Sequence, residues 1–323
     1  MPIAVQPVSS ALTWADHWYH IRARLGFRRA HHRVEPGLYA LGNPDPDSPV
    51  LVSANYTLSY DALRSALLGV NAWILVLDTH GVNVWCAAGK GTFGTEELVQ
   101  RIQATDLGRL VRHRLLILPQ LGAPGVSAHE VKQRSGFRVE YGPVRAADLP
   151  EYLKTRQATP QMRRVRFSIG DRAVLIPVEA VNIALPVLLI TAALRVTGVV
   201  HHFYNQAVAA VLAGAVLFPL LLPWIPTRDF STKGYLLGAL LALPLILREV
   251  LAGPQAVWWR QAAGALSSLL IVSTVSAFLS LNFTGSTVFT SRSGVRREIF
   301  RYVPAMAGSL GAGIGFSLLL WLL

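Results

Sequence analysis

The sequence predicts two parts: an α/β domain with a doubly wound sheet of the Rossmann or flavodoxin-like type, then an all-α transmembrane domain of five helices. The 323 residues are 52% hydrophobic and only 15% charged, which is too apolar for two ordinary soluble domains. Short β-rich and helical segments alternate up to about residue 150, and long apolar runs follow. We therefore divide the chain into a soluble domain at 1–150, a basic linker at 151–172 and a transmembrane domain at 173–323.

The soluble domain is expected to alternate strands and helices. Short segments rich in β-branched residues predict strands at 50–53, 73–78, 115–118 and 137–141. Helices are predicted at 58–68, 95–104 and 127–134, the last opening with the capping-box pair Ser127 and Glu130. This alternation implies a mostly parallel sheet, in which ligands bind at the carboxyl ends of the strands.

Five apolar runs are each about as long as a helix that crosses a bilayer. They lie near residues 173–194, 206–225, 234–251, 261–281 and 303–323. Basic residues follow the positive-inside rule if the N-terminal domain is cytoplasmic and the C-terminus lies outside the inner membrane. The inward-facing set is Arg163, Arg164, Arg166, Arg172, Arg228, Lys233, Arg292, Arg296, Arg297 and Arg301, against Arg195, Arg248 and Arg260 outside.

The formal net charge of +12 clusters where hydrophobic segments begin and end. We therefore assign it to a membrane surface and expect no nucleic-acid partner, since neither half carries the motifs of nucleic-acid modules. The single cysteine excludes an intramolecular disulfide and a protein-borne iron–sulfur cluster. The N-terminus lacks a basic region followed by an apolar run and a cleavage site, so no secretory signal is expected. An amphipathic helix is expected at residues 11–25.

The segment around Cys86 predicts a short helix at the ligand edge of the sheet. Asn83 suits an N-cap, and Gly89 or Gly91 would end the helix. The helix N-terminus and the nearby Lys90 favour the thiolate form of Cys86. A lone cysteine is nevertheless more often an inert core residue, so its neighbours must decide its role.

Other kinds of site fit this segment less well. A phosphate-binding loop would need glycine where Val84 stands and a hydroxyl residue directly after Lys90. A zinc site would need more Cys or His ligands at close spacing. Asp78 and His80 begin the Asp-x-His-x-x-Gly signature of methyltransferase cobalamin modules, but Asn83 replaces its glycine. His80 therefore stays open as a rival cobalt ligand.

The run NVWCAAGKGTFG resembles the cap-helix signature Asn-(Val/Ile)-Trp-Cys-Ala-(Ala/Gly)-Gly-Lys of the corrinoid protein of microbial mercury methylation, the HgcA family, at all eight positions. The resemblance extends from about residue 35 to the end and includes PVLVSANYTLSYDALR, AWILVLDTHG and NFTGSTVFTSRSGV. The related corrinoid subunit of the acetyl-CoA pathway has a similar pocket without the cysteine.

The resemblance implies a base-off corrinoid, such as cobalamin, whose cobalt takes the thiolate of Cys86 as its lower axial ligand. It implies methyl transfer from methylcobalt(III) to Hg(II), producing methylmercury. A thiolate trans to the methyl group should weaken its bond to cobalt, and soft Hg(II) needs methyl as a carbanion equivalent or radical. Cys86 is the implied catalytic and cobalt-binding residue. The implied cofactor-binding residues are Ser53, Asn55, Asn83, Val84, Trp85, Cys86, Ala87, Gly89, Lys90, Gly91, Gln120, Gly122 and Gly125.

The resemblance also implies partners. These are a methyl-tetrahydrofolate-type donor system and, as reductant, a ferredoxin-like protein with two [4Fe–4S] clusters. We expect the arginine-rich loop at 292–301 and the basic linker to dock that acidic carrier or the inner leaflet of the lipid bilayer.

Two other functions stay open. One is a corrinoid methyl carrier whose native acceptor is not mercury. The other is a membrane receptor or transporter with a corrinoid-sensing domain, which polar spans would favour. Here Glu179 and Asn182 are the main polar exceptions in otherwise apolar runs, so we expect the membrane half to act as an anchor.

Overall fold

The computed structural model describes residues 5–27, 31–196, 201–251, 257–287 and 289–322. The chain forms two compact units. The α/β unit comprises Met1–Ala23 and Phe27–Arg166, and the helical unit comprises Arg24–Gly26 and Phe167–Leu323. Residue 323, the last of the fifth predicted span, lies outside the described residues.

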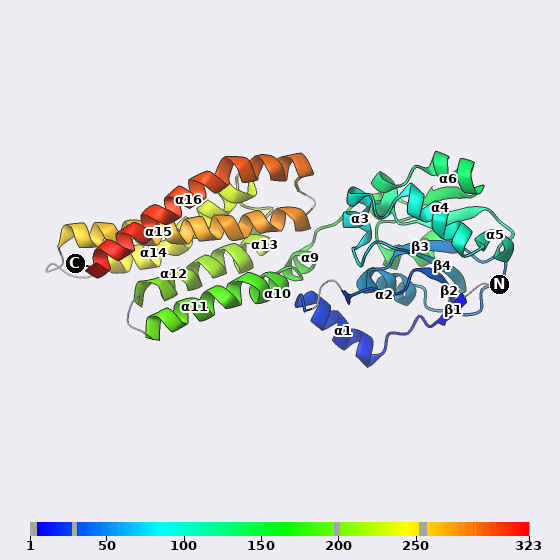
Figure 1. Cartoon of the computed structure of the whole chain (residues 1–323), viewed down its shortest axis with the longest axis horizontal. Coiled ribbons are helices and arrows are strands. Elements are labelled where there is room, and N and C mark those ends of the chain that lie inside the picture. Colours follow the sequence, from blue (N-terminus) through cyan, green and yellow to red (C-terminus); the bar gives the residue numbers. More distant parts are fainter. Residues whose placement is uncertain (1–4, 28–30, 197–200, 252–256, 288, 323) are drawn as a thin grey trace. The chain divides into compact units, whose positions relative to one another are not determined.

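The described part of the α/β unit is built on a six-stranded sheet of order β1-β2-β4-β3-β5-β6 (Figure 1). Neighbours among β3, β4, β5 and β6 pair in parallel, whereas β2 pairs antiparallel with β4 and parallel with β1. The four predicted strands are confirmed to within one residue at each end, while β1 and β2 were not predicted. The strands are β1 (Val5–Val8), β2 (Gly37–Leu41), β3 (Val50–Ala54), β4 (Ala72–Leu77), β5 (Leu115–Leu118) and β6 (Arg138–Tyr141).

Helices cover both faces of this sheet (Figure 1). On one face lie α2 (Thr57–Ala66) and α7 (Leu149–Thr155), and on the other α4 (Thr95–Ala104) and α6 (Ala128–Ser135). The central strands β3 and β4 are buried on both faces, which explains their nearly continuous runs of apolar residues. The three predicted helices are thereby confirmed.

The predicted capping box at Ser127 forms only in half. The Ser127 hydroxyl accepts a hydrogen bond from the Glu130 amide at 3.4 Å. The Ser127 amide itself donates to the Thr95 hydroxyl at 2.8 Å, so the cap links α6 to the start of α4 instead of closing on Glu130. A tertiary contact has replaced the local one.

The predicted linker at 151–172 is structured. Tyr152 of α7 and Met162 of α8 (Pro160–Arg163) are buried in the core on the α2 face of the sheet. The short helix α9 (Ile169–Ala173) then begins with a complete capping box between Ser168 and Asp171 and belongs to the helical unit.

Five helices in the described part of the chain are long and apolar enough to cross a membrane. Each overlaps one of the five predicted spans. They cover Ile169–Ala193, Phe203–Leu221, Phe230–Val250, Trp258–Gly285 and Ser293–Leu322. The helices that form these spans are α10 (Ile176–Glu179), π-helix η4 (Ala180–Ala184), α11 (Leu185–Val196), α12 (His201–Val211), π-helix η5 (Leu212–Leu217), α13 (Phe218–Leu221), α14 (Phe230–Val250), α15 (Trp258–Asn282) and α16 (Arg292–Leu322).

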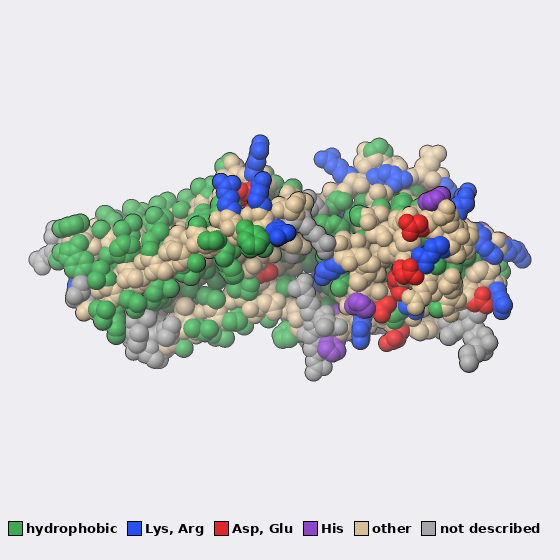
Figure 2. Space-filling view, turned by 45° about the horizontal axis from the view of Figure 1, so that its top comes forward, with side chains coloured by type: hydrophobic (Ala, Val, Ile, Leu, Met, Phe, Trp, Pro, Cys, Tyr) green, Lys and Arg blue, Asp and Glu red, His purple; other side chains and the backbone are tan. Residues whose placement is uncertain are grey.

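The helical unit packs through small residues and presents large apolar ones outward. A Cβ at Gly238 would lie 2.5 Å from the Cα of Ser273, and one at Gly234 would lie 2.6 Å from that of Ala277, so both glycines let α14 approach α15 closely. Leu240 and several other leucines of this unit are exposed. Hydrophobic side chains cover much of the face of this unit that Figure 2 shows. Small residues between the helices and large apolar residues on the surface are the packing pattern expected of candidate membrane-spanning helices.

A seam of buried hydroxyl residues runs along α15, which the sequence analysis did not anticipate. Gln206 donates to the Ser268 hydroxyl at 3.1 Å, and the hydroxyls of Ser267 and Ser317 lie 2.5 Å apart. These contacts join α12 and α16 to α15, as polar side chains do between helices in membranes. The seam consists of Ser267, Ser268, Ser273, Thr274, Ser276 and Ser280.

Two of the predicted inward-facing cations are buried within the helical unit. The Arg172 guanidinium donates to the Leu220 carbonyl at 2.7 Å and lies 5.0 Å from the centre of the Trp224 ring. The Lys233 ammonium donates to the Ile225 carbonyl. Both cations therefore bind backbone carbonyl groups near helix ends, where these groups lack partners within the helix.

Candidate functional site

The site opens where the chain reverses its direction of winding. From β3 the chain passes to β4 on one side and later to β5 on the other, so a crevice forms between the carboxyl ends of β3 and β5. A cavity of about 330 Å³ lies there. Of the predicted site residues, Ser53, Asn83, Val84 and Trp85 line it, and Ser59 and Leu63 of α2 close another side.

The predicted cap helix is confirmed as α3 (Val84–Lys90). The Asn83 side chain accepts a hydrogen bond from the Cys86 amide at 2.9 Å, and Gly91 ends the helix in the left-handed region at φ 85°. This is the N-cap and C-cap chemistry that the two residue types favour.

The two faces of α3 differ in burial. Val84, Ala87 and Ala88 are buried against the core, whereas Cys86 is half-buried and Trp85 is 36% exposed. Gly89, Lys90 and Gly91 are exposed. Cys86 is therefore not the inert core thiol that a lone cysteine most often is, since it belongs to the outward face of the helix.

Two glycines predicted to contact a cofactor pack closely on α3 and on Phe93, which follows it, and their cofactor contact stays a prediction. A Cβ at Gly122 would lie 2.5 Å from the Phe93 ring, and one at Gly125 would lie 2.9 Å from the Cα of Ala88. Phe93 is fully buried. Only glycines let the turn η2 (Gln120–Gly125) pack this closely on the segment that carries Cys86.

Gln120 and Tyr141 hold the two ends of η2. The Gln120 side chain accepts a hydrogen bond from Arg163 at 2.5 Å, so this arginine, predicted to lie in a linker, reaches the edge of the site. The Tyr141 hydroxyl donates to the Val126 carbonyl at 2.6 Å, and burial raises the pKa of this tyrosine.

Asn55 positions the loop between β4 and α3. Its buried carboxamide oxygen accepts from the Thr79 amide at 3.0 Å, the Thr79 hydroxyl at 2.9 Å and the Gly81 amide at 3.0 Å. Its nitrogen donates to Asp78 at 3.1 Å. Asn55 therefore has a structural role in this loop, since its acceptor oxygen is engaged, and its predicted contact with the cofactor stays a prediction.

His80 lies in the same loop and stays a rival to Cys86. Its backbone has φ 56°, its amide donates to Asp78 at 2.9 Å, and its ring nitrogen Nδ1 lies 3.5 Å from that carboxylate. The imidazole is 71% exposed. A histidine oriented by a carboxylate is a common metal-ligand arrangement, so geometry leaves two accessible donors at this edge.

Alanine substitutions at two glycines should separate packing from cofactor contact. Gly125→Ala should destabilise the protein by about 1–3 kcal/mol through overpacking against Ala88 and Phe93. Gly89→Ala, where a Cβ meets nothing within 4 Å, should leave stability unchanged or raise it by roughly 0.5–1 kcal/mol. Thermal unfolding of the full chain in detergent measures both changes. A large loss of stability in Gly89→Ala would contradict its placement on the outward face.

The α/β unit is similar to subunits of acetyl-CoA decarbonylase/synthase. Residues 27–153 match the family model for the CO dehydrogenase/acetyl-CoA synthase delta subunit. The gamma subunit of the Methanopyrus kandleri complex is 37% identical over 128 residues, which cover 39% of this chain and 27% of that protein. The Archaeoglobus fulgidus gamma subunit is 33% identical over 124 residues, covering 38% and 26%.

The chain thus spans about a quarter of the length of these curated relatives. The family match includes α3 and the whole cavity, whereas the apolar helices lie outside it. The similarity supports a relation to the acetyl-CoA pathway subunits, and the specific resemblance to mercury methylation rests on the motif around Cys86.

Proposed function

We propose that the α/β unit carries a corrinoid and that the chain is a corrinoid-dependent methyltransferase whose methyl acceptor is Hg(II). One observation carries the proposal: a thiol on the outward face of α3, beside a cavity at the ligand edge of the sheet. The similarity to acetyl-CoA decarbonylase/synthase subunits supports the methyl-carrier part. The mercury part rests on the residues around Cys86.

The residues at this edge fit a corrinoid in three respects. The cavity is mostly apolar and, at about 330 Å³, is large enough for a cofactor tail. A Cβ at Gly89 would meet nothing within 4 Å, so this face of α3 leaves room for a flat macrocycle. Cys86 offers a soft sulfur donor, half-exposed on that helix.

A bound corrinoid supplies a cobalt ion that accepts and releases a methyl group. The residues of the chain would hold that ion and tune it. The Cys86 thiolate would hold the cobalt, and its strong electron donation would suit methyl transfer to the soft ion Hg(II). Asn83 fixes the first turn of α3, and Ala87 and Ala88 anchor the helix in the core, so the sulfur has a defined direction.

We also propose that the helical unit anchors the chain in the cytoplasmic membrane, with the α/β unit in the cytoplasm and the C-terminus outside. The five apolar helices and their outward-facing leucines support this. A methyl-tetrahydrofolate-type system would supply the methyl group. The chain has one cysteine and cannot hold iron–sulfur clusters, so a ferredoxin-like protein with two [4Fe–4S] clusters would supply electrons.

The start of α16 offers a docking surface for that carrier. Arg296 and Arg297 are exposed, with Arg296 over the Phe300 ring at 5.6 Å and Arg297 3.6 Å from Asp229. Reversing both charges to glutamate should slow cobalt reduction severalfold, and salt should slow the unchanged protein in the same way. Arg109→Glu, at an exposed arginine of α5 (Leu107–Leu110), is the control. Equal rates for all three proteins would contradict docking at this surface.

A methyl acceptor other than Hg(II) should also be tested, because the described residues that line the cavity include no cysteine or histidine that would select mercury. The full chain, loaded with cobalamin and given a methyl donor, should be offered Hg(II) and a small thiol together. The proposal predicts methylmercury as the main product. Methylation of the thiol alone would favour a methyl carrier with a non-mercury acceptor.

A further inference from the structure

The N-terminal helix α1 (Trp14–Arg24) has two opposite faces. At 3.6 residues per turn, positions 16, 20 and 23 lie on one side, and positions 14, 18 and 21 lie on the other. Ala23 is buried, whereas Trp14 is 80% exposed, Trp18 52% and Ile21 49%. The polar side of the helix is therefore the one that packs, and the apolar side is open.

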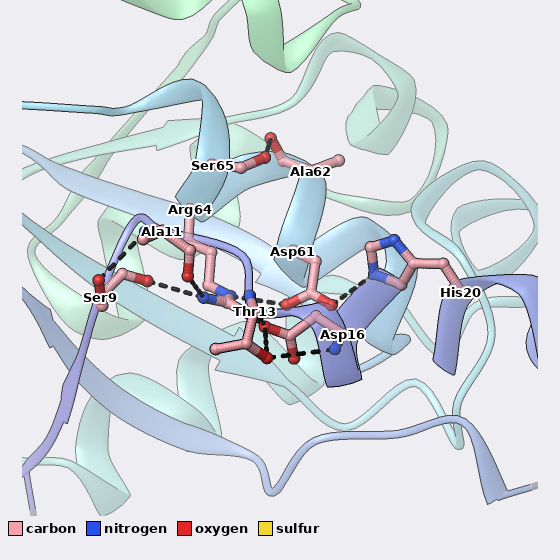
Figure 3. Close-up of polar contacts among 9 residues, drawn as sticks. All are labelled: Ser9, Ala11, Thr13, Asp16, His20, Asp61, Ala62, Arg64 and Ser65. Carbon is pink, nitrogen blue, oxygen red and sulfur yellow. Dashed lines mark hydrogen bonds and ion pairs between the residues drawn. The ribbon is translucent and has the colours of Figure 1, made fainter. Parts of the chain in front are cut away.

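An ionic cluster, buried at Asp61 and Arg64 and partly buried on the α1 side, fastens the polar side of α1 to α2 (Figure 3). The Arg64 guanidinium pairs with Asp61 at 2.6 Å and with Asp16 at 3.1 Å. The same guanidinium donates to the carbonyls of Ser9 and Ala11 at 2.8 and 2.9 Å. His20 completes the cluster with a contact of 2.7 Å to Asp61.

Within the cluster, the Asp16 carboxylate is held by Thr13 and Arg64. Although burial raises the pKa of Asp16, hydrogen bonds from Thr13 and the neighbouring Arg64 outweigh it and hold that pKa below its usual range. Buried ion pairs add little net stability, but their hydrogen bonds fix the orientation of the helices that they join. The cluster therefore sets which side of α1 faces away from the protein.

The open side has the composition of a bilayer-interface helix. The rings of Trp14 and Trp18 stack with their centres 6.4 Å apart. Arg22 and Arg24 are exposed and flank this side on its two edges. Tryptophan prefers the level of lipid headgroups, and flanking arginines are attracted to anionic lipids.

We propose that the open side of α1 lies in the headgroup region of an anionic bilayer and so gives the α/β unit a second, fixed attachment to the membrane. The proposal rests on the membrane location of the helical unit. The described part of the same chain contains five helices suited to span a bilayer, and the last residue of α1 and the two that follow it, Arg24–Gly26, group with that unit. Lipid is thus the occupant that both the charge and the chain connectivity favour. Anionic phospholipid headgroups would supply the partners of these arginines.

The experiment compares two fluorophore positions in the full chain reconstituted into vesicles of phosphatidylcholine and phosphatidylglycerol. The native cysteine is first removed by Cys86→Ala, and an environment-sensitive dye is then attached to a new cysteine in either Trp18→Cys or Leu68→Cys. Leu68 is a matched control because it is apolar, 79% exposed and also in the α/β unit. The dye at position 18 should shift to the blue and be quenched severalfold more strongly by headgroup-level nitroxide lipids than the dye at position 68. Omitting phosphatidylglycerol should reduce the difference.

Flotation with the vesicles reads out membrane anchoring separately, so the two proposals can fail independently. A chain that floats but shows equal, weak quenching at both positions overturns the inference about α1 and leaves the anchor intact. A blue shift at position 18 without lipid quenching assigns the surface to a protein contact and also overturns it. A chain that does not float is not anchored in the bilayer, and this result overturns both the anchor and the inference about α1.

Discussion

Cys86→Ala should abolish methyl transfer to Hg(II) while the protein stays folded. The fold should survive because the capping bond from Asn83 goes to the backbone amide of residue 86, and alanine is the strongest helix former. The loss should be at least roughly a hundredfold, since removing even a group that only hydrogen-bonds to a metal ligand costs about 10–100-fold. Cys86→Thr should fail in the same way, because a hydroxyl has a similar size but is a hard donor. Methylmercury formation by the cobalamin-loaded full chain measures the effect.

His80→Ala is the matched control for these variants. It removes the other accessible donor at this edge of the sheet and leaves α3 untouched. Its activity should remain within a few-fold of that of the unchanged protein. If Cys86→Ala keeps most of the activity while His80→Ala loses it, the thiol is not the ligand.

Asn55→Ala should have the largest effect on stability among the site residues. It removes the acceptor of the Thr79 and Gly81 amides, and each buried donor left without a partner costs about 1–3 kcal/mol. We expect a loss of about 3 kcal/mol or more in the free energy of unfolding. Cofactor binding should weaken as well, because the loop that leads into α3 loses its fixed shape.

Ser53→Ala is the control for Asn55, since it lines the cavity from the neighbouring strand. Its hydroxyl makes one hydrogen bond, to the Ala54 carbonyl at 3.3 Å, so the loss should stay within about 1 kcal/mol. Thermal unfolding in detergent compares the two variants. Similar midpoints for Asn55→Ala and Ser53→Ala would mean that the hydrogen bonds of Asn55 do not hold the loop.

Local chemistry made α3 and the parallel strands predictable. Asn83 and Gly91 act on groups within a few residues, and β3, β4 and β5 are short apolar runs bounded by turns. In β6 and the residue before it, apolar and charged side chains alternate. The two N-terminal strands were not predicted. Pro7 cannot donate a backbone hydrogen bond, which confines β1 to the edge of the sheet. The short strand β2 begins at Gly37, and its partner β4 lies more than thirty residues away in the sequence.

The roles of Asn55, Gly122 and Gly125 could not be predicted, because each depends on contacts between segments far apart in the sequence. Asn55 bonds residues more than twenty positions later, and both glycines fit against Phe93. A glycine that lets a ligand approach and a glycine that lets another backbone approach give the same sequence signal. Serine in α15 was overlooked for a similar reason, since it barely lowers the hydropathy of a long apolar run.

The most direct test of the central claim is the visible absorption spectrum of the full chain loaded with cobalamin. Thiolate ligation to cobalt predicts that Cys86→Ala changes the spectrum to that of a base-off corrinoid without a sulfur ligand, while His80→Ala leaves it unchanged. A spectrum that survives the loss of Cys86 and changes with the loss of His80 would contradict the assignment of Cys86 as the cobalt ligand.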